Sequence, residues 1–236
     1  MNIIQKIFSP FYEILAPQHC EVCGKYIGDE YHRFTFMCEK CSDRLPITDN
    51  NDFLRARLYD NFAKDEVSLS SVYSLFSLKQ GFEYMPIIHS LKYFGRKDTG
   101  YELGLELGRK LYKHSMNDYN SIIPIPIHHA RKRERGYNQS SLISNAISEV
   151  LDIPVDEKLL KRIRYTRTQT QLNALERQEN VASVFQVDQK RIPNIKSGKF
   201  LLVDDVVTTG STFNHCGIAL LEAGAYRVDA AALASA

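Results

Sequence analysis

Apolar residues along this chain form short continuous runs, and each run is followed by a segment in which apolar residues recur at helical spacing. The clearest run is Phe200–Val203, and the helical segment after it is marked by Phe213, Cys216, Leu220 and Ala223. Runs without polar interruption are typical of strands that are covered on both faces. The pattern therefore predicts a strand, a loop and a helix within a parallel α/β sheet.

The same alternation recurs twice earlier in the chain and once at its end. We expect strands over residues 69–78, 121–127 and 226–233, and helices over 87–94, 101–112 and 142–150. Pro124 should mark the end of the middle strand, because proline donates no hydrogen bond to a neighbouring strand. Gly136 should permit the start of the helix that follows, Asn138 should cap it, and Gly224 should end the helix before the last strand.

The first quarter of the chain is patterned more weakly. Residues 1–17 have helical spacing interrupted by Pro10, and their single basic residue favours a helix packed on the main domain over one that lies on a membrane surface. Residues 46–66 predict a mixture of helix and linker. We therefore expect an N-terminal module over residues 1–66 and a sheet domain over residues 67–236.

The chain has five cysteines, and four of them form two C-x-x-C pairs: Cys20 with Cys23, and Cys38 with Cys41. Two such turns can point four thiolates at one Zn²⁺ ion, and a full thiolate set leaves no open position, so the predicted zinc is structural. A redox dithiol is the competing interpretation, but it needs only one pair. His19 and His32 could replace a thiolate, although four cysteines make that unnecessary.

Two adjacent acids, Asp204 and Asp205, follow the run at 200–203. Paired carboxylates at the end of a strand can accept hydrogen bonds from a vicinal diol, such as that of a ribose. A loop rich in hydroxyls comes next, and its candidate phosphate-binding residues are Val207, Thr208, Thr209, Gly210, Ser211 and Thr212. Backbone N–H groups and hydroxyls at a helix N-terminus favour an anion.

The order of these residues limits the class of ligand that the segment can bind. The loop carries no lysine, so it is not the phosphate-binding loop of nucleoside triphosphatases. A ribose 5-phosphate fits the acids and the loop at once. An ordinary buried strand with acidic turn residues is the alternative, but it does not account for acids, hydroxyls and glycine in sequence along one strand–loop–helix unit.

Three basic positions or stretches accompany this unit. After the strand at 121–127 come the cations Arg131, Lys132, Arg133 and Arg135. Anions bind at the carboxyl ends of strands in open α/β sheets, and arginine matches phosphate oxygens, although a charge run alone is usually a solvated loop. Lys92 is a candidate phosphate contact, with a solvated helix lysine as the alternative. A later stretch contains Arg164 and Arg167 in a polar segment, 164–171, that is typical of a mobile loop and could act as a lid.

Composition limits the function classes. The 236 residues are 44% apolar and carry a net charge of +2, so any basic surface that binds nucleic acid must be local. No run approaches the roughly 20 apolar residues that a membrane span needs, and the N-terminus lacks the features of a signal peptide. We expect a cytoplasmic protein without membrane insertion.

Taken together, these motifs resemble the ComF family (competence protein F), whose members join a phosphoribosyltransferase-like domain to an N-terminal zinc module. The matching segments are the paired C-x-x-C motifs, IHSLKY at 88–93, RKRERGYNQ at 131–139, TQTQL at 168–172, RQENV at 177–181 and LLVDDVVTTGST at 201–212. The resemblance implies a type I phosphoribosyltransferase fold that binds phosphoribosyl pyrophosphate (PRPP) with Mg²⁺. It further implies that Asp204 and Asp205 bind the ribose hydroxyls, that residues 208–212 hold the 5-phosphate, and that Arg131 lies at the pyrophosphate loop.

The resemblance leaves the activity open. An enzyme would displace pyrophosphate from the anomeric carbon of PRPP, with Arg131, Arg133 and Arg135 neutralising the leaving group and Asp205 acting as base. The rival hypothesis is a DNA-uptake factor without catalysis that binds single-stranded DNA through the basic stretches 131–135 and 158–167, with Tyr137 and Tyr165 stacking on bases. A third is a zinc-stabilised adaptor to a helicase-like partner. No motif fixes the acceptor.

Overall fold

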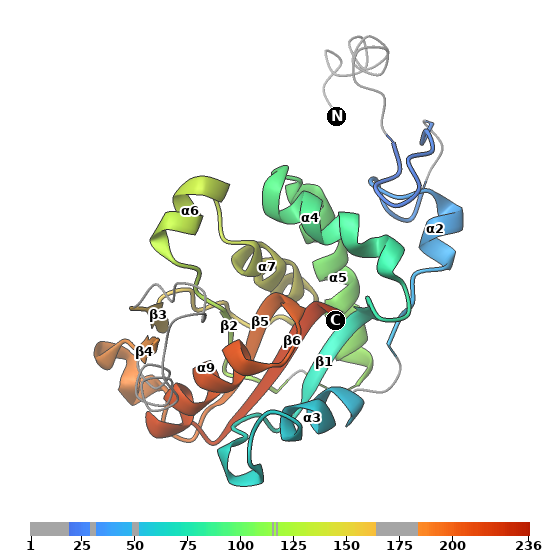
Figure 1. Cartoon of the computed structure of the whole chain (residues 1–236). Coiled ribbons are helices and arrows are strands. Elements are labelled where there is room, and N and C mark those ends of the chain that lie inside the picture. Colours follow the sequence, from blue (N-terminus) through green and yellow to red (C-terminus); the bar gives the residue numbers. More distant parts are fainter. Residues whose placement is uncertain (1–18, 29–31, 49–51, 115, 117, 164–183) are drawn as a thin grey trace, which may run out of the picture.

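The computed structural model describes residues 19–28, 32–48, 52–114, 116, 118–163 and 184–236. A four-stranded sheet lies at the centre (Figure 1), with the strand order β1-β6-β5-β2 and every neighbouring pair parallel. The strands are β1 (Val72–Ser77), β2 (Ser121–Pro124), β5 (Lys199–Val207) and β6 (Arg227–Ser235). A separate antiparallel pair joins β3 (Leu160–Arg162) to β4 (Phe185–Val187). The predicted parallel α/β architecture is confirmed.

Helices cover both faces of this sheet (Figure 1). One face carries α4 (Met85–Tyr93), α5 (Lys97–Lys113) and α7 (Gln139–Leu151), and the other carries α3 (Asp52–Tyr59) and α9 (Ser211–Glu222). Successive residues of β5 serve the two layers, since Leu201 and Val203 pack with α5 and α7 whereas Leu202 packs with α9. This double burial explains why the central strands are uninterrupted apolar runs.

Short elements complete the described chain. They are α2 (Glu39–Asp43), α6 (His129–Arg135) and three 3₁₀ turns, η1 (Lys64–Glu66), η2 (Phe82–Tyr84) and η3 (Gln189–Asn194). Among the residues described, no helix is both long and apolar enough to cross a membrane.

The N-terminal module packs against the first face of the sheet domain. Phe34, Phe36 and Met37 belong to the same buried apolar cluster as Leu103 and Leu107 of α5. The described part of residues 1–66 therefore shares its core with the sheet domain, and a division at residue 66 stays a prediction.

Most predicted elements are confirmed, and three details differ. The basic run at 131–135 is part of a helix, α6, whereas the alternative to an anion-binding cluster had been a solvated loop. Gly136 was expected to permit the start of the next helix, but it ends α6 in a left-handed conformation with φ 78°. Asn138 caps α7 as predicted, because its side chain accepts a hydrogen bond from the Ser140 N–H. The helix predicted over 87–94 ends one residue earlier, at Tyr93. Phe94 is 77% exposed, and Gly95 after it has the left-handed φ of 64° at which the chain turns.

Some predictions fall on residues that the structure does not describe. They are the helix over 1–17 and the lid at 164–171 with Arg164 and Arg167. The β3–β4 pair on either side of 164–183 was missed, because three-residue strands are too short to show periodicity.

Candidate functional site

The acid pair and the hydroxyl-rich loop lie together at the carboxyl end of β5. Asp204 and Asp205 fall within the strand, two residues before its end, and residues 208–210 lead directly into α9. Gly210 is the N-cap of α9 with φ 77°, and a Cβ placed on it would lie 2.2 Å from the Leu58 Cδ2. Glycine is therefore required twice here, for its backbone conformation and for space. The first N–H groups of a helix have no carbonyl partner within the helix, and that of Ser211 donates to the Thr209 hydroxyl at 3.3 Å.

Asp204 is held by hydrogen bonds within the protein. The Ser140 hydroxyl donates to its Oδ1 at 2.8 Å, and the Asp205 backbone N–H donates to the same oxygen at 2.9 Å. Burial, and to a lesser extent the neighbouring charge of Asp205, together raise the pKa of Asp204 to about 7. Near neutral pH this carboxyl is therefore poised between its neutral and its ionised form.

Asp205 faces a lysine from the other side of the site. The Lys92 Nζ lies 3.2 Å from the Asp205 Oδ1, and the two side chains are 24% and 10% exposed. Lys92 comes from the last turn of α4, more than 100 residues earlier in the chain. The structure thus brings this predicted phosphate contact to the acid pair itself.

The segment Arg135–Gln139 joins the end of α4 to the rest of the site. The Tyr137 hydroxyl donates to the Leu91 carbonyl at 2.5 Å, and the Asn138 amide donates to the Ile125 carbonyl, just past β2, at 3.1 Å. The Arg135 guanidinium lies 5.5 Å from the centre of the Tyr93 ring. The RGYNQ motif therefore fastens α4, β2 and α7 together around the acids.

The other cations of this stretch point into solvent. Arg131, Lys132 and Arg133 are exposed on α6, which follows the end of β2. Their position beyond the carboxyl end of a sheet strand is the predicted one, and any role in binding stays a prediction. A row of exposed cations on one short helix suits an extended anion as well as a small one.

Four cysteines converge in the N-terminal module. The Sγ atoms of Cys20, Cys23, Cys38 and Cys41 all lie within 4.8 Å of one another, and those of Cys23 and Cys38 are 3.8 Å apart. Thiolates bound to one tetrahedral zinc at about 2.3 Å lie roughly 3.8 Å apart, so the donor set and its spacing fit Zn²⁺. Among the described residues, neither His19 nor His32 belongs to this group. The cluster could hold a metal ion such as zinc.

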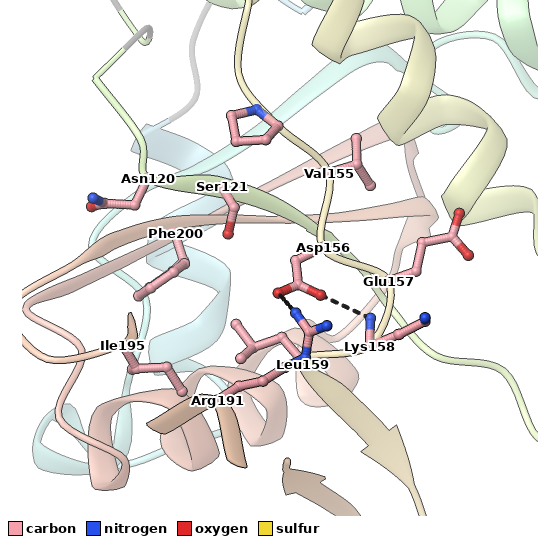
Figure 2. Close-up of a pocket in the computed structure, with 11 residues that line it drawn as sticks. Asn120, Ser121, Val155, Asp156, Glu157, Lys158, Leu159, Arg191, Ile195 and Phe200 are labelled. Atoms are coloured by element: carbon pink, nitrogen blue, oxygen red, sulfur yellow. Dashed lines mark hydrogen bonds and ion pairs between the residues drawn. The ribbon is translucent and has the colours of Figure 1, made fainter. Parts of the chain in front are cut away.

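A pocket of about 560 Å³ lies at the opposite, amino-terminal edge of the sheet (Figure 2). Ser121 and Phe200, at the starts of β2 and β5, line it together with Asp156 and Arg191. Two of its charged side chains pair with each other, because Arg191 Nη1 lies 2.5 Å from Asp156 Oδ2. The Lys158 backbone N–H donates to the other Asp156 oxygen, Oδ1. The acid pair, where two carboxylates, a lysine and a helix N-terminus come together, is the candidate functional site.

Comparison with known proteins identifies the domain that carries the acid pair. The phosphoribosyl transferase domain family matches residues 138–236, which include α7, β5, α9 and β6. Together with the parallel sheet and its flanking helices, this match identifies the type I phosphoribosyltransferase fold.

Two groups of curated proteins are similar in sequence. Competence protein F of Haemophilus influenzae is 38% identical over 125 residues, which cover 52% of this chain and 53% of that protein. The DNA utilization protein YhgH is 33% identical in Shigella flexneri and 32% identical in Escherichia coli, over 61% of this chain and 63% of each relative. The similarity thus spans between half and two thirds of these relatives' length.

Among solved structures, the glutamine PRPP amidotransferase of B. subtilis, complexed with ADP and GMP, aligns with a TM-score of 0.42 at 21% identity. The alignment covers 60% of this chain and 29% of that one.

Proposed function

Since this chain belongs to the ComF family, we propose that it binds PRPP with Mg²⁺ at the carboxyl edge of β5 and serves in the use of DNA taken up from outside the cell. The observation that carries the proposal is the convergence of two carboxylates, a glycine-bearing helix N-terminus and one lysine at a single strand end. The names of the similar proteins support the link to DNA, and the matched domain supports PRPP.

Each part of PRPP has a partner in this arrangement. The ribose hydroxyls would donate to Asp204 and Asp205, and the 5-phosphate would accept from the loop at 208–212 and the first N–H groups of α9. Carboxylate oxygens are ligands that Mg²⁺ prefers, so the residues present fit a metal-bound diphosphate. Bound Mg²⁺ would neutralise charge on that diphosphate. Lys92 would leave Asp205 for the diphosphate, because its long side chain reaches both.

We further propose that the site transfers the 5-phosphoribosyl group to an acceptor. A lone pair of the acceptor forms a bond to the anomeric carbon, the bond from that carbon to the pyrophosphate oxygen breaks, and pyrophosphate leaves with the electron pair. Asp205 takes the acceptor's proton. Lys92, which pairs with Asp205, and Arg135, which lies against the Tyr93 ring, would balance the charge of the departing pyrophosphate.

The exposed cations of α6 favour a second candidate function, which is binding of single-stranded DNA. Arg131, Lys132 and Arg133 offer charge, and Tyr93, which is 61% exposed, offers a stacking surface next to Arg135. This activity would depend strongly on salt and would not need the acid pair. An adaptor that docks on a DNA-uptake helicase is the remaining alternative.

We propose in addition that the four-cysteine cluster holds a structural zinc ion. Metal that binds only the folded protein contributes to folding directly, so its loss should lower the stability of the module.

Calorimetric titration of PRPP and Mg²⁺ tests the pocket. The double variant Asp204→Asn/Asp205→Asn should bind at least tenfold more weakly, because amides cannot accept all the hydrogen bonds that carboxylates do. Asp156→Asn, at the opposite edge of the sheet, is the matched control and should bind like the native protein. Equal binding by all three proteins would show that the ligand binds elsewhere. Absence of binding to the native protein would refute the proposed PRPP site and favour the binding of single-stranded DNA instead.

A further inference from the structure

Glu21, which stands between the first two cysteines of the module, reaches out of the module into the sheet domain. Its carboxylate accepts a hydrogen bond from the Ser90 hydroxyl at 2.5 Å and one from the Thr99 hydroxyl at 3.2 Å. The Arg96 Nε lies 3.8 Å away. The Glu21 side chain is only 9% exposed, so its two hydroxyl contacts are largely shielded from water, whereas the Arg96 side chain is 60% exposed and adds little.

These contacts end on α4 and on the start of α5, close to the candidate sugar-phosphate site. Ser90, Leu91 and Lys92 are consecutive residues in the last turn of α4, and each contacts a different partner. Ser90 bonds Glu21 of the module, the Leu91 carbonyl accepts from Tyr137, and Lys92 pairs with Asp205. One helical turn is therefore held by the cysteine module on one side and by the ligand site on the other.

The module also contacts α5 at a place that does not lead to the site. The Thr35 hydroxyl and backbone N–H both donate to the Glu102 carboxylate, at 2.5 and 2.9 Å, and Arg33 pairs with Glu106 at 2.7 Å. These bonds join the same two parts of the protein, and none of them touches α4. A variant at one of these bonds therefore serves as a control, because it weakens the docking of the module without touching the last turn of α4.

We propose that Glu21 is a positioning residue for the PRPP site, which holds the last turn of α4 so that the Lys92 ammonium faces the acid pair. The four-cysteine turn fixes the backbone of Glu21 between Cys20 and Cys23, so the folded module sets where this carboxylate stands. The inference rests on the proposed binding of PRPP at Asp204 and Asp205. It assigns to the cysteine module a part in ligand binding beyond stabilising its own fold.

The first experiment compares PRPP affinity, with Mg²⁺, in three full-length variants. Glu21→Ala should weaken binding about fivefold to tenfold, since Lys92 then samples orientations away from the diphosphate. Glu21→Gln should stay within about twofold of the native protein, because its amide oxygen can accept from one hydroxyl while its NH₂ group donates to the oxygen of the other. Glu102→Ala is the matched control and should also stay within about twofold, although it loses two hydrogen bonds to the module.

A double-variant cycle shows whether Glu21 acts through Lys92. In a Lys92→Ala background, adding Glu21→Ala should cause no further loss of PRPP affinity, because the side chain that it positions is gone. Independent losses that multiply would overturn the proposal, as would an unchanged affinity of Glu21→Ala or an equal loss in Glu102→Ala. Bound metal, measured by release to a colorimetric chelator, should be the same in every variant.

A measurement without ligand keeps this inference separate from the function on which it rests. Amide hydrogen exchange at residues 90–94 should be faster in Glu21→Ala than in the native protein and in Glu102→Ala, and removal of the metal by a chelator should have the same local effect. If the native protein binds no PRPP, the proposed function fails while this exchange result still tests the positioning. Unchanged exchange at residues 90–94 in Glu21→Ala would refute the positioning itself.

Discussion

Gly210 gives the sharpest test of how the fold builds the ligand loop. Replacing it with alanine forces a Cβ into a left-handed conformation at φ 77°, which costs roughly 1–2 kcal/mol. The new Cβ would also lie 2.2 Å from the Leu58 Cδ2, and Leu58 is buried on α3, so overpacking adds about 1–3 kcal/mol. We expect Gly210→Ala to lower the free energy of unfolding by about 2–5 kcal/mol, which corresponds to a fall in Tm of roughly 5–15 °C for a chain of this size.

A second glycine separates the two contributions. Gly136 has almost the same backbone conformation, φ 78°, but a Cβ there would meet nothing within 4 Å. Gly136→Ala should therefore cost only the backbone strain, about 1–2 kcal/mol. Urea unfolding of both variants, followed by circular dichroism, measures the difference. Equal losses would show that Leu58 gives way freely and that the contact does not constrain the loop.

The contact with Leu58 can be confirmed by removing it. Leu58→Ala alone should be destabilising, because it leaves a cavity in a buried position. Combined with Gly210→Ala, it should cost less than the sum of the single losses, since the alanine methyl group then fills part of that cavity. Additive losses would refute the steric explanation.

Three further predictions concern other parts of the molecule. Because burial raises the pKa of Asp204 to about 7 from an ordinary value near 3.8, the native state holds this proton more tightly than the unfolded state, and its contribution to stability is lost as the pH rises from about 4 to 7. Asp204→Asn should therefore unfold at higher urea concentration than the native protein at pH 8 and at a similar one at pH 4. Cys20→Ser should release bound zinc and lower the Tm, and a variant that stays equally stable without zinc would rule out a structural metal. Tyr119→Phe should destabilise by roughly 1–3 kcal/mol in urea unfolding, because the Tyr119 hydroxyl donates at 2.8 Å to Asp229, a fully buried carboxylate.

The predictions from sequence succeeded where the chain folds on itself locally. The unit from β5 to α9 combines an apolar run, a turn residue and a helical repeat within two dozen residues, so periodicity identifies all of it. The four cysteines were found in the same way, because each pair is one tight turn. Only their approach to within 4.8 Å needed the folded chain.

The predictions were incomplete where residues distant in sequence meet. The basic run around Arg133 forms α6, and its few apolar residues gave no periodicity to reveal a helix. Lys92 was expected to contact a phosphate, but its pairing with Asp205 depends on how α4 crosses the sheet, and no local pattern encodes that. Glu21 carried no signal at all, since one acid among the cysteines of a small module is ordinarily a solvated side chain.

These contacts give a physical reason for the segments that characterise the chain. IHSLKY forms the C-terminal two thirds of α4, RGYNQ fastens the end of that helix to β2 and α7, and LLVDDVVTTGST supplies the acids and the loop. The cysteine module joins this assembly through Glu21, at the residue next to Leu91. A domain that only bound sugar phosphate would need the last of these segments alone. RGYNQ and the cysteine module both contact α4, the helix that carries Lys92, so the position of Lys92 is what these contacts have in common. A variant that displaces Lys92 should therefore weaken ligand binding more than it lowers the stability of the fold.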